Sequence, residues 1–263
     1  MELRSSAIAI LVGAFAVVSV VGGGAREASA DGSATRGSRI TYVYRFDLSS
    51  RDAFQTMLES HGHTVSTVHI DDLDSYSFDQ TDLIIIGEDT DNSPPWGTSA
   101  AVANITNSGL PVIGIAQGGT NFFQDVNLFI GHLQTMGVSS NHGIVVENYW
   151  HHLWSVPEHV TIPPDNMVEL YASGSYANIV YIGSGMPSDV TCVGRPWNYP
   201  VHCGLTLEDW DGRFTALWSW EGSPSSMSDD AKALFRNLVV YDTLLFADGF
   251  ESGNTYYWST TMP

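Results

Sequence analysis

Two short, uninterrupted apolar runs limit what this chain can fold into. One is Leu83–Ile86 and the other is Val112–Ala116. A strand with one solvated face alternates apolar and polar residues, whereas a strand covered on both faces is apolar throughout. Runs of four or five residues have the length of strands and are too short for helices. The two runs therefore predict strands inside a sheet that has helices on both faces.

The segments around these runs alternate between strand-like and helix-like patterns. β-Branched and aromatic residues predict strands at Ile40–Arg45 and Thr64–Ile70, and helical spacing predicts a short helix at Ala100–Asn107. With a further helix between the first two strands, the order is β-α-β-β-α-β. Such alternation is typical of a mostly parallel central sheet in a three-layer α/β sandwich.

Two amphipathic helices begin at a capping-box spacing. Ser49 with Asp52 marks the first, and Ser226 with Asp229 marks the second, which follows a strand-like run at Phe214–Trp218. Apolar residues then recur at i, i+3, i+4 and i+7, which places them on one helix face. The predicted stripes are Phe54, Met57, Leu58 and His61 in the first helix, and Ala231, Leu234, Phe235 and Leu238 in the second.

The middle of the chain, residues 141–212, has a different composition. It is rich in Gly, Pro, Asn and Trp, with short strand-like pieces such as Gly143–Val146, Met167–Tyr171 and Asn178–Ile182. We interpret it as a β-rich insertion that extends the same sheet, and not as a second core. The sequence thus predicts one α/β domain over residues 39–245.

The first thirty residues predict a secretory signal peptide. Arg4 precedes an apolar run, Ala7–Val21, and Ala28-Ser29-Ala30 supplies a small-x-small site for cleavage after Ala30. The run is shorter than the ~20 residues of a membrane span, although an uncleaved anchor is the alternative. Cleavage would leave a flexible leader at residues 31–38 on a bacterial protein that is secreted or periplasmic and has no membrane anchor.

The chain ends in a segment rich in Gly, Ser, Thr and aromatic residues, residues 246–263. Its sequence DGFESGNTYYW is similar to a short terminal motif, DGFESG(D/N)T..W, of many exported bacterial proteins. The resemblance implies a sorting or surface-association tail. A strand patch that packs on the domain is the other interpretation.

Composition restricts the partners of the chain and the state of its cysteines. The 29 Asp and Glu residues against 10 Lys and Arg give a net charge of −19, which argues against nucleic acid or an anionic membrane as a partner. A hydrophobic content of 43% excludes a disordered chain. In an exported protein, Cys192 and Cys203 predict a disulfide, with a catalytic thiol as the alternative.

The segment Pro111–Phe123, PVIGIAQGGTNFF, contains the most informative pattern in the chain. An apolar strand runs through small residues directly into a helix, as in a nucleophile elbow, where free helix N–H groups can bind an anion. Here the chain resembles the class I glutamine amidotransferase-like superfamily, whose elbow is G-x-C-x-G. Further similarity lies in His151–Pro157 and Ala216–Tyr241. The resemblance implies a flavodoxin-like α/β fold from Arg39 to Asp242.

The chain departs from this family at the position of the nucleophile. Aligned on Gly114–Gly118, the motif places Ala116 where the family has its cysteine. A methyl group cannot form a thioester, and no H-x-E motif follows the late strand to activate a thiol. No G-x-S-x-G motif is present either. We therefore expect no glutaminase chemistry and assign no catalytic residue.

Acidic residues directly follow the first apolar run. Glu88 and Asp89 lie after the strand end, where open α/β sheets bind ligands, and Asp91 follows. Asp89 and Asp91 are candidate ligands for Ca²⁺, because hard cations bind oxygen atoms. A solvated turn is the alternative, and we expect no other cofactor.

We expect a ligand site at this edge of the sheet, lined by residues that end or follow strands or lie in the matched segments. These are Arg45, Glu88, Asp89, Gln117, Gly118, His151 and Glu221. Tryptophans around the insertion could stack on a sugar or could belong to the core. They are Trp150, Trp154, Trp197, Trp210, Trp218 and Trp220.

The predicted function is binding of a small ligand, with a saccharide favoured because exported relatives of the trehalose-utilisation type imply a role in sugar metabolism. Two alternatives stay open. One is a secreted hydrolase in the same crevice, either a glycosidase that pairs Glu88 or Asp89 with Glu221 or a metal-assisted enzyme. The other is a surface-associated structural module.

Overall fold

A computed structural model describes residues 37–90, 95–131, 142–173, 175–183 and 185–247, all within the unit Thr35–Pro263. The predicted signal peptide, residues 31–36 of the leader, Asp91 and the terminal motif lie outside the described residues. No helix of the described part is both long and apolar enough to span a bilayer.

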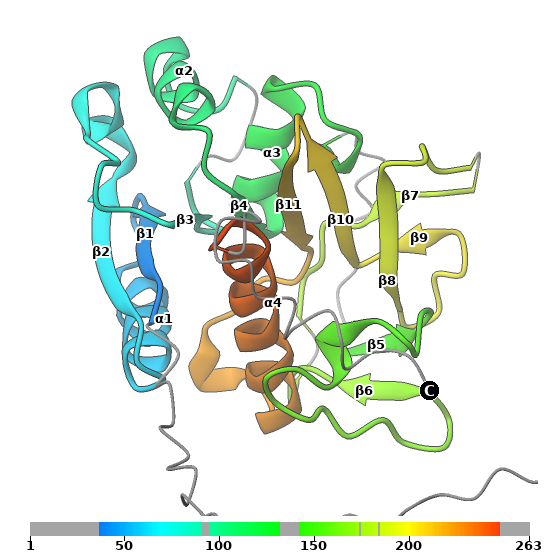
Figure 1. Cartoon of the computed structure of the whole chain (residues 1–263). Helices are drawn as coiled ribbons and strands as arrows, with labels where there is room; N and C mark the ends of the chain where they lie inside the picture. The colour runs from blue at the N-terminus through cyan, green and yellow to red at the C-terminus, as the bar shows by residue number, and fades with distance from the viewer. Residues whose placement is uncertain (1–36, 91–94, 132–141, 174, 184, 248–263) are drawn as a thin grey trace, which may run out of the picture. The chain divides into compact units, whose positions relative to one another are not determined.

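Nine of the described strands form one mixed sheet in the order β2-β1-β3-β4-β11-β10-β8-β5-β6 (Figure 1). The parallel half consists of β1 (Arg39–Tyr44), β2 (Thr64–His69), β3 (Leu83–Ile86), β4 (Val112–Ile115) and β11 (Arg213–Trp218). The antiparallel half consists of β10 (Leu205–Trp210), β8 (Val190–Pro196), β5 (Gly143–Val146) and β6 (Met167–Glu169). A separate pair is formed by β7 (Val180–Tyr181) and β9 (His202–Cys203).

This topology confirms the predicted fold class. The parallel strands follow the flavodoxin-like order. The chain adds β2 on one side of β1 and then adds β3, β4 and β11 on the other side, so the switch point lies between β1 and β3. The predicted insertion is also confirmed, because β5, β6, β8 and β10 extend the same sheet. Turn residues in the middle of the chain therefore connect antiparallel strands and do not begin a second core.

Helices cover both faces of the sheet. One face packs against α1 (Leu48–Glu59) and α4 (Asp229–Ala247), and the other packs against α2 (Ser99–Ser108) and α3 (Ala116–Asp125). Short 3₁₀ turns lie at Ile70–Ser75, Phe129–Gly131, His152–Trp154 and Pro224–Ser226. Alternate residues of β3 belong to the two core clusters, and each is fully buried. This double burial explains why the run Leu83–Ile86 contains no polar residue.

The helices form where predicted, but their caps differ. The carboxylate of Asp47 accepts from the Ser50 N–H at 2.9 Å and caps α1, so the expected pairing of Ser49 with Asp52 is wrong. The Ser228 hydroxyl accepts from Ala231 N–H at 3.0 Å at the start of α4, two residues after the predicted Ser226.

The stripe predicted for α1 is correct except at its last member. Phe54, Met57 and Leu58 are buried, but α1 ends at Glu59, so His61 lies beyond the helix and is exposed. The four predicted apolar residues of α4 are all buried.

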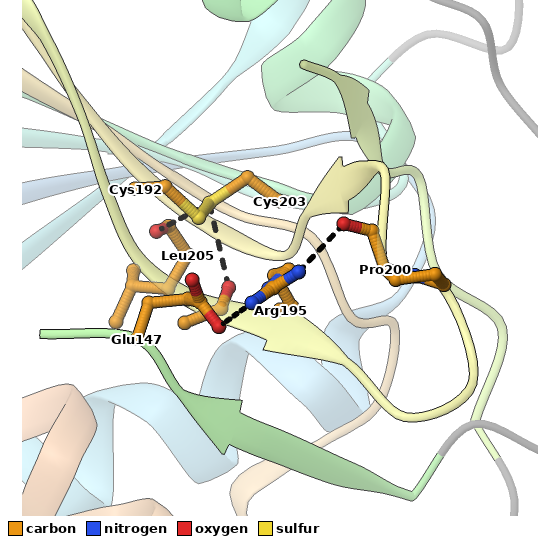
Figure 2. Close-up of a disulfide and its surroundings, with 7 residues drawn as sticks. Glu147, Cys192, Arg195, Pro200, Cys203 and Leu205 are labelled. Atoms are coloured by element: carbon orange, nitrogen blue, oxygen red, sulfur yellow. Dashed lines mark hydrogen bonds and ion pairs between the residues drawn. A yellow bond between two sulfur atoms is a disulfide. The ribbon is translucent and has the colours of Figure 1, made fainter. Parts of the chain in front are cut away.

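The disulfide joins Cys192 on β8 to Cys203 on β9, with a Cα–Cα distance of 5.7 Å. Figure 2 shows the turn that it closes: Arg195 forms an ion pair with Glu147, and its Nη1 donates to the Pro200 carbonyl at 2.7 Å. The predicted disulfide is confirmed. Because the sequence contains no other cysteine, the chain has no thiol for catalysis.

Candidate functional site

The ends of β1 and β3, where the topology changes direction, are joined by the Asp89 carboxylate. Its Oδ2 accepts from the backbone N–H groups of Phe46 and Asp47, both at 2.5 Å, and from that of Arg45 at 3.2 Å. Charge-assisted bonds of this kind are stronger than neutral ones. Asp89 therefore organises the loop between β1 and α1, and its carboxylate is engaged by donors of the protein itself.

The next strand end is the turn from β4 into α3. Ala116 is fully buried and adopts φ +46°, in the left-handed region that residues with a side chain rarely occupy. The glycines around it allow close backbone contact: a Cβ on Gly118 would lie 2.1 Å from the Gly87 carbonyl oxygen. A Cβ on Gly114 would lie 2.6 Å from the Cα of Gly119. The sharp turn predicted from the small residues is thus present.

Glu88 lies between these two turns and contacts three further segments. Its backbone carbonyl accepts from Gly118 N–H at 3.1 Å. Its Oε2 accepts from Gly222 N–H at 2.6 Å, and its Oε1 accepts from the Ser50 hydroxyl at 3.3 Å. Burial raises the pKa of Glu88 to about 7, and the neighbouring carboxylates of Glu221 and Asp47 add to the increase.

Glu221 lies on the segment that follows β11. Its N–H donates to the Tyr176 carbonyl at 2.8 Å, and its own carbonyl accepts from the Ser175 hydroxyl. Burial raises the pKa of this half-buried carboxyl as well. Two carboxyl groups with raised pKa values therefore lie at the carboxyl edge of the parallel strands.

Two buried tyrosines, Tyr42 and Tyr171, lie close enough to Glu88 to feel its charge. The Tyr171 hydroxyl accepts from the Trp218 indole N–H at 3.3 Å and lies 3.5 Å from the Gly222 carbonyl. Burial raises the pKa of both Tyr42 and Tyr171 well above the ordinary value, and the charge of Glu88 contributes in each case. Both hydroxyls therefore stay protonated and can donate hydrogen bonds.

Most tryptophans belong to the core. Those at positions 96, 154, 210, 218 and 220 are buried, whereas Trp150 is 93% exposed. The aromatic residues that reach solvent at the site are Phe46, which is 72% exposed, and Tyr176, which is 44% exposed. Each is bonded through its backbone to one of the acidic residues, Phe46 to Asp89 and Tyr176 to Glu221.

The structure brings most of the predicted ligand residues to one edge. Arg45 follows β1 and places its guanidinium 4.8 Å from the centre of the Phe46 ring. Gln117, the half-buried second residue of α3, and Gly118 lie beside Glu88, and Glu221 follows β11.

His151 is the exception among the predicted residues. Its ring packs against Tyr241 with centroids 5.2 Å apart, and Tyr241 packs against Phe214 at the start of β11. It therefore lies at the end of that strand opposite to Glu221, and its assignment to the ligand site is wrong. Burial lowers the pKa of His151 to about 4, which leaves the ring neutral at neutral pH.

Sequence reasoning missed the residues that surround Glu88 from distant segments. Ser50, Tyr171 and Gly222 reach it or its partners from α1, from the end of the insertion and from the loop after β11. None belongs to a motif, and only the sheet order brings the segments together. Among the described residues, no group of three or more His, Cys, Asp or Glu side chains is arranged to hold a metal ion.

No family model matches the sequence, and no curated protein does. The structure is similar to that of a protein from Thermoplasma acidophilum named as a proposed GMP synthase component, with a TM-score of 0.52, 12% sequence identity and coverage of 77% of this chain and 92% of that one. A glutamine amidotransferase from Thermotoga maritima also matches, at a TM-score of 0.45 and 8% identity over 70% of this chain and 75% of that one. Together with the sheet order, the first similarity shows that this chain has a flavodoxin-like α/β fold of the kind seen in glutamine amidotransferase-like structures.

Proposed function

We propose that this chain is an exported amidotransferase-like domain that binds a small, neutral, hydroxyl-rich ligand of the saccharide class and has no glutaminase activity. The observation that supports this most is the position of Glu88. It joins the ends of β3 and β11 to the turn at α3, at the place where open α/β sheets bind ligands.

The surroundings of Glu88 favour a sugar over other small molecules. Carboxyl groups accept hydrogen bonds from sugar hydroxyls, and exposed aromatic rings pack against the apolar face of a pyranose. Glu88 and Glu221 supply the first, and Phe46 and Tyr176 supply the second. Binding sites commonly combine apolar walls with a few placed polar groups. The net charge of −19 disfavours anionic ligands.

The loss of glutaminase chemistry follows from Ala116 and from the disulfide. The turn lacks a nucleophile, and both sulfur atoms of the chain's cysteines are joined to one another at β8 and β9. We expect no release of ammonia from glutamine. We also expect no labelling of the native protein by thiol-directed alkylating reagents.

The test is a thermal-shift and calorimetric titration with D-glucose, sucrose and sorbitol, because a ligand of the native state raises the melting temperature. Glu221→Gln should weaken binding at least tenfold, about 1.4 kcal/mol. Glu169→Gln, at an exposed position on β6, is the matched control and should leave binding unchanged. A wild-type protein that responds to none of the three probes would contradict the proposal.

A glycoside hydrolase at the same carboxyl pair is the second candidate, because the pKa of Glu88 near 7 is suited to a general acid. Chromogenic glycosides test it: turnover that Glu88→Gln abolishes and Glu169→Gln preserves would favour hydrolysis over binding alone. A protein that binds sugar without cleaving any glycoside would favour the binding protein.

A further inference from the structure

Two buried polar atoms beside the candidate site have no hydrogen-bonding partner. They are Nδ2 of Asn178, a residue that is 2% exposed, and Oγ of Ser219, which is fully buried. Buried polar atoms are nearly always paired, because an unpaired one costs free energy that no other contact recovers. Other unpaired buried atoms of the described residues belong to His202, Thr206, Arg213 and Trp220. Asn178 and Ser219 differ from these because they lie opposite one another beside the candidate site, where a ligand can complete both.

The two atoms lie on one face of a short antiparallel pair. Ala177 pairs with Trp220, and Asn178 N–H donates to the Ser219 carbonyl at 2.8 Å. Residues directly opposite one another in such a pair point to the same face, so Asn178 and Ser219 are neighbours.

The same alternation extends this face to the solvent. Because side chains two residues apart share a face, Tyr176 and Glu221, which also lie opposite one another, continue the strip outwards. Trp220 points to the other face, into the core with Trp218. The strip therefore runs from a partly exposed end at Tyr176 to a buried end at Asn178.

The register of the sheet places this strip beside the turn at Ala116. Trp218 is level with Ile115 in the parallel pairing of β11 and β4, so Ser219 comes level with Ala116. Glu88 reaches the same segment through its bond to Gly222 N–H. The backbone of the strip therefore passes beside the glycine-rich turn, and the residue that follows Glu221 is bonded to Glu88.

We infer that Asn178 and Ser219 form the inner end of the ligand site, where the Asn178 amide donates to an oxygen atom of the ligand and the Ser219 hydroxyl bonds to the same oxygen or to its neighbour. This inference rests on the proposed function and specifies the ligand further. A cation would be repelled by the amide N–H, and an anion by Glu88 and Glu221. The ligand group at this position is a neutral hydroxyl or carbonyl.

The experiment compares Ser219→Ala and Asn178→Leu with Thr206→Val. Thr206 is a buried residue of β10 whose hydroxyl is also unpaired, and it lies inside the sheet opposite Leu217. Removing an unpaired buried polar atom is neutral or stabilising, so the ligand-free melting temperature of all three variants should stay equal to or above that of the wild type. Affinity for the sugar or polyol that binds the wild type should fall at least tenfold in Ser219→Ala and Asn178→Leu, and should be unchanged in Thr206→Val.

The outcomes separate this inference from the proposed function. Wild-type affinity in both Ser219→Ala and Asn178→Leu would overturn the inference and leave the proposed function standing, since the pair would then serve only the folded chain or an internal water. Loss of affinity in Thr206→Val as well would overturn the inference too, because the effect would not belong to the strip. A wild-type protein that binds none of D-glucose, sucrose and sorbitol overturns both.

Discussion

At the scale of single residues, the turn at Ala116 combines a left-handed backbone conformation with a buried side chain. The left-handed φ of +46° normally favours glycine, and here an alanine adopts it inside the core. The small residues on both sides allowed the turn to be predicted from the sequence. The positive φ could not be predicted, because it depends on the approach of α3 to Gly87 and Gly114.

Substitution at Ala116 should show how this strain and the buried methyl group balance. Glycine removes the strain of a left-handed backbone, about 1–2 kcal/mol. Against this, it loses about 0.8 kcal/mol from burial of the methyl group and about 0.4–1 kcal/mol because the unfolded chain gains conformational entropy. We therefore expect Ala116→Gly to change the free energy of unfolding by less than about 1 kcal/mol. Ala116→Val, with a branched side chain at positive φ, should lose more than about 2 kcal/mol in urea unfolding. Equal effects of the two variants would contradict this account.

Glu88 should make stability dependent on pH. Its pKa is about 7 in the folded protein against an ordinary value of 4.5, so between these values the folded chain binds a proton that the unfolded chain has released. The contribution of Glu88 to the free energy of unfolding then decreases as the pH rises through this range. Glu88→Gln removes the titration, so its stability relative to wild type should increase from pH 4.5 to 7 and level off above.

The measurement for Glu88 is urea unfolding across this pH range, with Glu169→Gln as the control at an exposed acidic position. The control should follow the wild-type profile. Parallel profiles of Glu88→Gln and the wild type would show that burial does not raise the pKa of this carboxyl.

At the scale of elements, the sequence predicts the strands and helices well and their ends less well. Apolar runs and helical stripes arise from burial, and every turn or strand residue of an element contributes to that pattern. The caps at Asp47 and Ser228 depend on one hydrogen bond each, and several Ser and Asp residues nearby could supply it. The error at His61 has the same origin, since the period of the stripe continues past the residue where α1 ends.

The contact between β3 and α3 requires a residue without a side chain at position 118. In Gly118→Ala the new Cβ would lie 2.1 Å from the Gly87 carbonyl oxygen and 2.3 Å from the Thr90 hydroxyl oxygen. We expect a loss of about 3 kcal/mol, because backbone at this distance must move. Gly62→Ala is the control: Gly62 has φ +88° but no atom within 4 Å, so only the backbone strain of about 1 kcal/mol remains. A smaller loss in Gly118→Ala than in Gly62→Ala, measured by urea unfolding, would contradict the close contact.

At the scale of the whole molecule, the parallel half of the sheet was predictable and the site only partly so. The location of Glu88, Gln117 and Glu221 at one edge of the sheet was predictable, because the ends of parallel strands meet there. His151 was misplaced because β5 belongs to the antiparallel half, whose strand ends do not follow that rule. The unpaired atoms of Asn178 and Ser219 could not be predicted, because an unpaired atom is a property of the folded chain alone.

The disulfide should stabilise the antiparallel half without determining the fold. It links residues 11 positions apart, and closing a loop of this size contributes about 3 kcal/mol by restricting the unfolded chain. Reduction should lower the free energy of unfolding by this amount, while the far-ultraviolet circular dichroism of the native state stays unchanged. The double variant Cys192→Ala/Cys203→Ala is the control, and reductant should not affect it. Loss of all secondary structure on reduction would show that the fold depends on the bond.

The two outer strands of the sheet affect how copies of the chain meet at high concentration. The strand β6 has only three residues, and β2 presents Ser66, Thr67 and His69 among its six. A long, apolar edge strand would present unpaired backbone N–H and C=O groups, which could pair with another copy of the chain and start aggregation. The edge strands here are short or polar, and the strongly acidic chains repel one another. Both features favour a protein that stays unassociated at high concentration.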